Sequence, residues 1–248
     1  MRCFENIYYT DDRHPMQMLD IYLPDAESFS TFIYFHGGGL EAGSRKGEAP
    51  SLSRTLCAHG VALVSVEYRL YPQAAYPDFI EDAAAAVAWV KAHIGEYGQC
   101  DRLYVGGSSA GGYLSMMLCF DGRYLGRHGI RPTDLAGFVH DAGQPTVHYN
   151  VLRQRGIDTR RVIVDESAPL YHVGLAEVYP PMLFIVSDND MENRLQQTDL
   201  MRSTLRHFGY DQDRIAYRLM HGNHCAYVNC EEDGENILGR EVLAFMGA

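Results

Sequence analysis

A serine inside a glycine-rich stretch has surroundings that indicate chemistry. The spacing G-x-S-x-G occurs at residues 107–111, with Ser109 at its centre, between an apolar segment and a helical one. Small residues beside Ser109 let a strand and a helix approach closely, so that the serine is held in a sharp turn. Such a serine can act as a nucleophile when a base removes its proton. The alternative is a glycine-rich turn of a nucleotide-binding fold, but no G-x-G-x-x-G lies there.

A nucleophilic serine needs a base, and the base needs a carboxylate that orients it. Two aspartates, Asp188 and Asp190, follow one apolar segment, and two histidines, His221 and His224, follow the next. We expect Asp190 and His224 to be the catalytic pair because they lie deeper in their loops. Asp188 and His221 remain the alternatives, and either aspartate could instead cap a helix. The two histidines could also bind a metal, but no third ligand supports a metal site.

A second glycine-rich segment offers backbone donors. Residues 36–39 read His-Gly-Gly-Gly and come directly after the apolar run 31–35. With no side chain in the way, the N–H groups of Gly38 and Gly39 can point at the oxygen on which charge develops during attack on a carbonyl. The N–H of Ala110 is the third donor that we expect in this oxyanion hole. The alternative is an ordinary glycine loop.

Strand-like and helix-like segments alternate along almost the whole chain. The expected strands are 18–23, 31–35, 61–66, 103–105, 135–139, 182–186 and 215–220, and the expected helices are 78–93, 111–120, 195–208 and 237–245. The first strand alternates apolar and polar residues, which is typical of an antiparallel strand. The others are continuous apolar runs and predict a mostly parallel sheet of about eight strands with helices on both faces, an α/β fold.

We expect a single domain over residues 1–248, because no linker or repeat interrupts the pattern. Residues 143–180 fit the pattern worst and are rich in polar residues, which indicates a small lid over one edge of the sheet. His36 and His148 are candidate substrate-binding residues. For His36 support of its own loop is the competing interpretation, and for His148 it is an ordinary place on the lid surface.

Together with Tyr-Arg-Leu-Tyr-Pro at 68–72 and Tyr-Pro at 76–77, the His-Gly-Gly-Gly segment and Ser-Ala-Gly-Gly at 109–112 resemble the hormone-sensitive-lipase-like branch of the α/β-hydrolases. Gln73 stands where that family usually has Glu. The resemblance implies an α/β-hydrolase fold, a Ser-His-Asp triad and esterase activity. Some members remove acyl groups from plant-polysaccharide fragments, and the long N-terminal cap of larger members has no counterpart here.

These observations predict a serine carboxylesterase for short-chain acyl esters, with acetyl esters of carbohydrates among its candidate substrates. An amidase or formamidase would use the same attacking groups, and the sequence does not separate the two. A catalytically inactive hydrolase-fold binding protein is the third alternative. Such proteins usually lack a member of the triad, and here a serine, suitable aspartates and a histidine are present.

Composition narrows the partners. The formal net charge of −11 argues against a general affinity for nucleic acid. The sequence contains no run of about 20 apolar residues, so we expect no membrane span. The six cysteines are scattered without C-x-x-C spacing, which together with the lack of a signal-like N-terminus predicts a reduced, cytoplasmic protein. We expect no metal and no cofactor, and a small-molecule ester as the partner. The sequence is compatible with a homo-oligomer.

Overall fold

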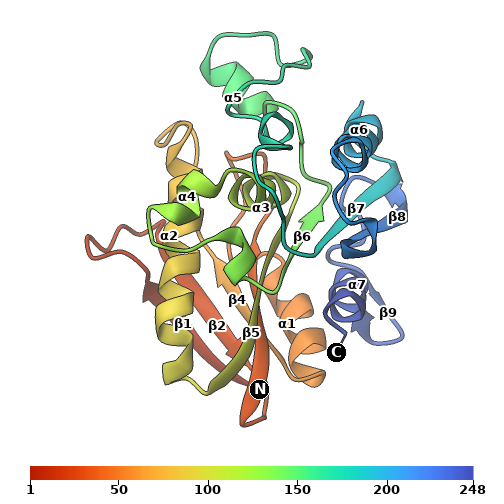
Figure 1. Cartoon of the computed structure of the whole chain (residues 1–248). Helices are drawn as coiled ribbons and strands as arrows, with labels where there is room; N and C mark the ends of the chain where they lie inside the picture. Colours follow the sequence, from red (N-terminus) through yellow and green to blue (C-terminus); the bar gives the residue numbers. More distant parts are fainter. Residues whose placement is uncertain (248) are drawn as a thin grey trace.

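The computed structural model describes residues 1–247, and a sheet of eight strands forms its centre (Figure 1). The strands are β1 (Arg2–Tyr8), β2 (Met18–Leu23), β3 (Ser28–Phe35), β4 (Val61–Val66), β5 (Gln99–Ser108), β6 (Gly137–Asp141), β7 (Met182–Asn189) and β8 (Ile215–Asn223). Their order is β1-β2-β4-β3-β5-β6-β7-β8. Strand β2 is antiparallel to both neighbours, and the pairs from β4 to β8 are all parallel. The predicted sheet and its early antiparallel strand are confirmed.

Seven helices accompany the sheet within the described residues. They are α1 (Ala49–Ala58), α2 (Asp78–His93), α3 (Ala110–Phe120), α4 (Gly122–Gly126), α5 (Tyr149–Gln154), α6 (Arg194–His207) and α7 (Ile237–Met246). A two-stranded hairpin of β9 (Glu231–Glu232) and β10 (Glu235–Asn236) precedes the last helix. The longest helix, α2, has 16 residues, and no helix in residues 1–247 is long and apolar enough to cross a bilayer.

The helices cover both faces of the sheet because each central strand is apolar on both sides. In β3, Ile33 and Phe35 pack in a hydrophobic layer with α2, α3 and α6, whereas Phe32 and Tyr34 pack in a second layer with α1 and α7. All six residues of β4 are buried in the same alternating way. Successive side chains of a strand point to opposite faces, so the two layers lie on opposite sides of the sheet.

Two elements near the N-terminus were not predicted. The sequence of α1 contains Pro50 and several hydroxyl residues, which have weak helix preference, yet six of its ten residues are buried. Packing against the sheet and α7 therefore overrides local preference. Strand β1 is an edge strand whose side chains are mostly exposed, so it lacks the apolar pattern that marks its neighbours. Strand β6 begins at Gly137, two residues later than expected.

Residues 143–180, the predicted lid, form α5, a short 3-10 turn (Pro169–His172) and connecting loops. Figure 1 shows α5 and these loops beyond the end of β6. The segment is tied together by a backbone hydrogen bond of 2.9 Å from the N–H of Val147 to the carbonyl of Ile163. It lies over the carboxyl ends of the parallel strands, where loops of α/β folds usually build their binding sites.

Candidate active site

Ser109 lies in the turn between β5 and α3 in a strained backbone conformation. Its φ is 55° and its ψ is −110°, values that a residue with a side chain rarely adopts. The turn is tight: a Cβ on Gly107 would lie 2.4 Å from the carbonyl oxygen of Phe35, and one on Gly111 would lie 1.9 Å from the same atom. The glycines of the motif are therefore needed for the close approach of helix and strand, as expected for a nucleophile elbow.

The structure brings Ser109, His224 and Asp190 together. The Nε2 atom of His224 lies 2.8 Å from the Ser109 hydroxyl, and its Nδ1 atom lies 2.5 Å from Asp190 Oδ1. The loop after β7 supplies Asp190, and the loop after β8 supplies His224. These distances fit a hydrogen-bonded relay in which the aspartate holds a hydrogen on Nδ1 and leaves Nε2 free to accept the serine proton.

Asp190 is held as an anion by several donors. Burial raises its pKa, but the hydrogen bond and charge of His224 lower it, and so do the N–H groups of Met191 at 2.7 Å and Ser187 at 3.2 Å. The net pKa is below the ordinary value for aspartate. An ionised carboxylate at this place orients the imidazole and stabilises its protonated form.

Asp188 and His221, the alternatives to the predicted pair, form a second pair within the last residues of β7 and β8. Asp188 Oδ2 lies 2.6 Å from Nδ1 of His221, and Oδ1 accepts the N–H of Gly222 at 2.9 Å. The His221 side chain is 97% exposed. This pair lies in solvent, and no hydrogen bond joins either residue to Ser109 in the described part of the chain.

The loop at 36–39 lies directly against the serine. A Cβ on Gly37 would lie 3.4 Å from the Cβ of Ser109. Gly38 and Gly39 have φ values of 113° and 65°, and the carbonyl of Gly38 accepts the N–H of Ala42 at 2.9 Å. This turn leaves the two glycine N–H groups without a backbone acceptor in the loops of residues 1–247. The predicted oxyanion donors Gly38, Gly39 and Ala110 are thus on the two segments that flank Ser109.

The structure does not support direct substrate contacts for His36 and His148. Both imidazoles are buried. The ring of His36 stacks on Tyr68, and its Nε2 lies 3.1 Å from Glu67. These contacts fix the start of the loop at 36–39. Nδ1 of His148 accepts the N–H of Asn150 at 3.2 Å and caps α5. Each histidine therefore holds a loop in place from inside the protein. Burial leaves neither imidazole exposed to a substrate.

A buried hydrogen-bonded chain lies beneath the serine and was not predicted. It runs from Tyr227 to Asp141, Ser108, Tyr34 and Glu48, with 2.5 Å between Ser108 and Asp141, 2.8 Å between Tyr34 and Ser108, and 2.5 Å between Tyr34 and Glu48. The three hydroxyls bring three protons to four contacts, so the chain is complete only when one carboxyl group is protonated. Such chains are buried at low cost only when every member is satisfied.

Asp141 is the member of this chain that best accepts the extra proton. Burial raises its pKa to about 7, against the opposing hydrogen bonds of Ser108 and Tyr227 and the charge of His224. Its backbone carbonyl accepts the Ser109 N–H at 2.8 Å. Asp141, the last residue of β6, therefore supports the strained turn through its backbone carbonyl.

Two further residues near the serine carry no sequence motif. Tyr149, at the start of α5, places its hydroxyl only 1.8 Å from where a Cβ on Gly39 would be. Cys225 has a positive φ of 53°, and its Sγ lies 3.7 Å from Nε2 of His224. Burial raises the pKa of the Cys225 thiol, so the group is neutral beside the histidine. Only the folded chain shows these contacts, because Gly39 and Tyr149 are far apart in sequence.

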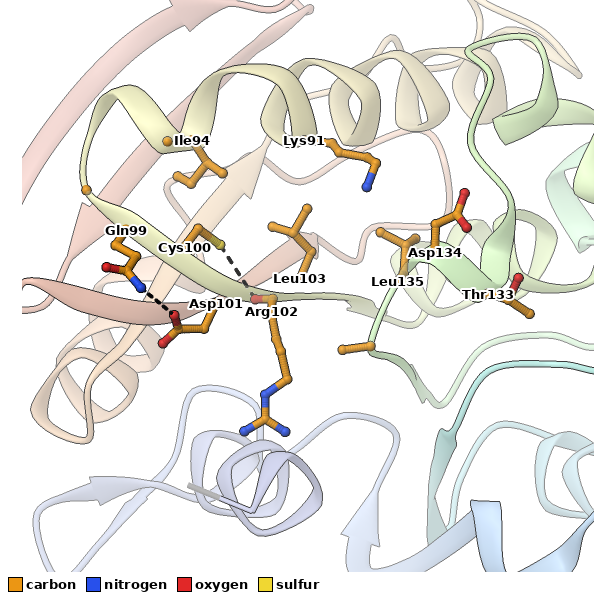
Figure 2. Close-up of a pocket in the computed structure, with 13 residues that line it drawn as sticks. Lys91, Ile94, Gln99, Cys100, Asp101, Arg102, Leu103, Thr133, Asp134 and Leu135 are labelled. Atoms are coloured by element: carbon orange, nitrogen blue, oxygen red, sulfur yellow. Dashed lines mark hydrogen bonds between the residues drawn. The ribbon is translucent and has the colours of Figure 1, made fainter.

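One hollow in the described surface lies away from the triad, at the amino end of the sheet (Figure 2). It has a volume of about 750 Å³ and is open to solvent. Figure 2 shows Lys91 and Ile94 at the end of α2, with Cys100 and Arg102 at the start of β5. Ligands of open parallel sheets bind at the carboxyl ends of the strands, so size alone does not make this hollow the active site.

No group of three or more potential metal ligands lies together within residues 1–247. A nucleophile after β5, followed by an acid after β7 and a histidine after β8, is the chain order of the α/β-hydrolases. Residues 19–125 match the family model described as BD-FAE. The strand order and the chain order of Ser109, Asp190 and His224 are those of an α/β-hydrolase fold.

Comparisons with individual proteins agree with this assignment. The probable carboxylic ester hydrolase LipM of Mycobacterium tuberculosis is 43% identical over 82 residues, which are 33% of this chain and 19% of LipM. Esterase LipI of the same organism is 36% identical over 104 residues, 42% of this chain and 32% of LipI. The matches therefore span about a fifth to a third of these relatives.

The solved structures cover more of the chain at lower identity. A truncated carbohydrate esterase from gut microbiota superposes with a TM-score of 0.79 at 19% identity, covering 100% of this chain and 97% of that one. Esterase B from Lactobacillus rhamnosis gives a TM-score of 0.80 at 19% identity, covering 99% of this chain and 85% of that one. These likenesses confirm the predicted α/β-hydrolase fold over the whole described sheet.

Proposed function

We propose that the protein is a carboxylesterase that hydrolyses short-chain acyl esters by nucleophilic catalysis. The observation that carries the proposal is the alignment of Ser109, His224 and Asp190, with 2.8 Å and 2.5 Å between the groups that exchange or share a proton. Relatives named as esterases support the reaction class. The roles assigned to individual residues below are part of the proposal.

In the first half of the reaction, Ser109 Oγ attacks the ester carbonyl carbon while its proton moves to His224 Nε2. The carbonyl π electrons move to the oxygen, which becomes an oxyanion. When this intermediate collapses, the bond to the alcohol oxygen breaks and the alcohol leaves with the proton from His224. Asp190 stays ionised and stabilises the imidazolium during both steps.

In the second half, water attacks the acyl-serine and gives its proton to His224. The Ser109 oxygen then leaves the second tetrahedral intermediate with that proton, and a carboxylic acid is released. The N–H groups of Gly38, Gly39 and Ala110 would bind the oxyanion of both intermediates. Each such donor typically contributes a factor of about 10²–10³ in turnover.

The lid, residues 143–180, supports a preference for small acyl groups. Tyr149 lies against Gly39, so the space next to the oxyanion loop is narrow. The lid and the sheet with its helices would form one domain over residues 1–248. The lid would close one side of the site. Acetyl esters of carbohydrates are the substrates we would test first, since one structural neighbour is a carbohydrate esterase.

The test is the loss of turnover in Ser109→Ala with 4-nitrophenyl acetate as substrate. We expect kcat/KM to fall by a factor on the order of 10⁴–10⁶ because no nucleophile remains. Ser203→Ala, which removes a hydroxyl on the surface of α6, is the matched control and should keep full activity. Thermal melting checks that both variants fold.

A fluorophosphonate probe gives an independent readout of the same proposal. It should label the wild-type protein on the peptide that contains Ser109 and leave Ser109→Ala unlabelled. Full turnover by Ser109→Ala, or labelling at a different residue, would show that the nucleophile lies elsewhere.

A further inference from the structure

Within residues 1–247 two arginines are almost completely buried, and one of the two has acidic partners. Arg45 is 7% exposed, and its guanidinium lies 3.0 Å from Asp20 and 3.1 Å from Glu67. Arg194 is 4% exposed, and it forms no ion pair within residues 1–247. A buried charge without a counter-ion is costly, so the difference between the two sites calls for an explanation.

The contacts of Arg194 fix its position without balancing its charge. Its guanidinium donates to the backbone carbonyl of Ala142 and, at 3.4 Å, to the side-chain oxygen of Gln144. Both acceptors are neutral. Asp190 is the acid whose charge acts most on Arg194, but its carboxylate is already bound by His224 and by two backbone N–H groups.

Arg194 lines a cavity of about 290 Å³ between the start of α6 and the lid. Arg160 and Arg161 of the lid also line it, and Glu192 is the one acidic residue in its lining. Arg160 is paired with its neighbour Asp158. Three arginines and one glutamate therefore line this space, in a chain whose net charge is −11.

The cavity adjoins the catalytic groups on two sides. Tyr149 lines it and places its hydroxyl against Gly39 of the oxyanion loop. Met191 lines it too, and its N–H donates to the Asp190 carboxylate at 2.7 Å. A group bound here would therefore lie next to the segments that carry Asp190 and Gly39.

We propose that this basic cavity receives a carboxylate of the substrate, so that the preferred esters carry a negative charge on their acyl or alcohol part. The proposal rests on the ester hydrolysis proposed above and names its substrate class. A guanidinium group and a carboxylate form paired, charge-assisted hydrogen bonds, and the substrate would supply the anion that Arg194 lacks. The small volume fits a carboxylate on a short chain, and the buried charge disfavours a long apolar acyl chain.

Two pairs of esters of matched size test the proposal and locate the charge. Mono-4-nitrophenyl glutarate and 4-nitrophenyl pentanoate differ by a carboxylate on the acyl side. The 4-acetoxybenzoate anion and its methyl ester differ by a carboxylate on the alcohol side. We expect kcat/KM to be about tenfold higher for the anionic member of at least one pair, and this preference to shrink at high salt.

Variants assign the preference to the cavity. Arg194→Met keeps the length and burial of the side chain, and Arg161→Gln removes a second charge from an exposed position, where folding is not at risk. Both should bring the ratio of the two kcat/KM values close to one in the pair that shows the preference. Arg131→Gln, at the opposite end of the sheet and paired with Asp134, is the control and should leave the ratio unchanged.

The outcomes separate this inference from the proposed function. Hydrolysis of the neutral esters that requires Ser109, with equal rates for the anionic and neutral members of both pairs, would overturn the carboxylate cavity and leave the esterase intact. A preference that survives in Arg161→Gln and in a folded Arg194→Met would also overturn it. Absence of hydrolysis for all four esters would overturn the esterase proposal itself, and the carboxylate cavity with it.

Discussion

Two aspartate–histidine pairs lie at the carboxyl ends of β7 and β8, and they differ in burial far more than in hydrogen-bond length. The distances from carboxylate to Nδ1 are 2.5 Å for Asp190 and His224 and 2.6 Å for Asp188 and His221. The exposed side-chain fractions are 1% and 21% for the first pair but 39% and 97% for the second. A short hydrogen bond is therefore no evidence of catalysis by itself.

The environment decides what each pair can do. Water and salt screen the Asp188–His221 pair, so its charges act weakly on anything beyond their contact. Around Asp190, burial and fixed N–H donors keep the carboxylate in one orientation, and the field at His224 is stronger for lack of water. The comparison predicts that matched substitutions in the two pairs will have very different effects on catalysis.

The largest difference is expected for the histidines. His224→Asn should lower kcat/KM for 4-nitrophenyl acetate by a factor on the order of 10⁴–10⁶, since the serine loses its base. His221→Asn should stay within about twofold of the wild type, because its ring makes no contact with Ser109. Steady-state kinetics of the two purified variants and the wild type at one pH measure the two changes in kcat/KM. A comparable loss in both would mean that the exposed histidine takes part in the reaction.

A smaller but still large difference is expected for the aspartates. Asp190→Asn should lower kcat by about 10⁴, because an amide favours the wrong tautomer of His224 and does not stabilise its protonated form. In Asp188→Asn the side-chain oxygen can still accept the N–H of Gly222, so kcat should change by less than about threefold. The inverse result, with Asp188→Asn the slower enzyme, would exchange the roles of the two carboxylates and remove the argument from burial.

The sequence predicts part of the fold and of the candidate site from local patterns. The spans of β4 and α2 follow from apolar continuity and from an alanine-rich helical stretch without glycine or proline, both local signals. The chain order of serine, aspartate and histidine placed the candidate site at one edge of the sheet. The choice of Asp190 over Asp188 rested on depth in a loop, and the hydrogen bonds from the structure are those expected for that choice.

Other parts of the site depend on contacts that no local pattern records. The hydroxyl of Tyr149 on Gly39, the unpaired charge of Arg194 and the chain from Tyr227 to Glu48 join residues that are remote in sequence. His36 and His148 illustrate the same limit in reverse. Polar residues in candidate loops suggested substrate contacts, and only packing shows that both rings are buried.

The smallest effect that still separates the two pairs is the dependence of stability on pH. Hydrogen bonds from Gly222 and His221 lower the pKa of Asp188, and for Asp190 the hydrogen bond and charge of His224 outweigh the burial that raises its pKa. A carboxyl group whose pKa is lowered on folding stabilises the folded state at pH values above its unfolded pKa of about 3.9. This stabilisation is lost as the pH falls through the folded pKa.

The difference in Tm between the wild type and each Asn variant should therefore be present at pH 6 and shrink below about pH 4. For Asp188→Asn it should be within about 2 °C and vanish in 1 M salt, whereas for Asp190→Asn it should persist because salt does not reach the buried carboxylate. Melting curves from pH 3 to pH 7 at two salt concentrations measure how the Tm difference depends on pH and on salt. Equal salt sensitivity in the two variants would show that burial does not distinguish the pairs.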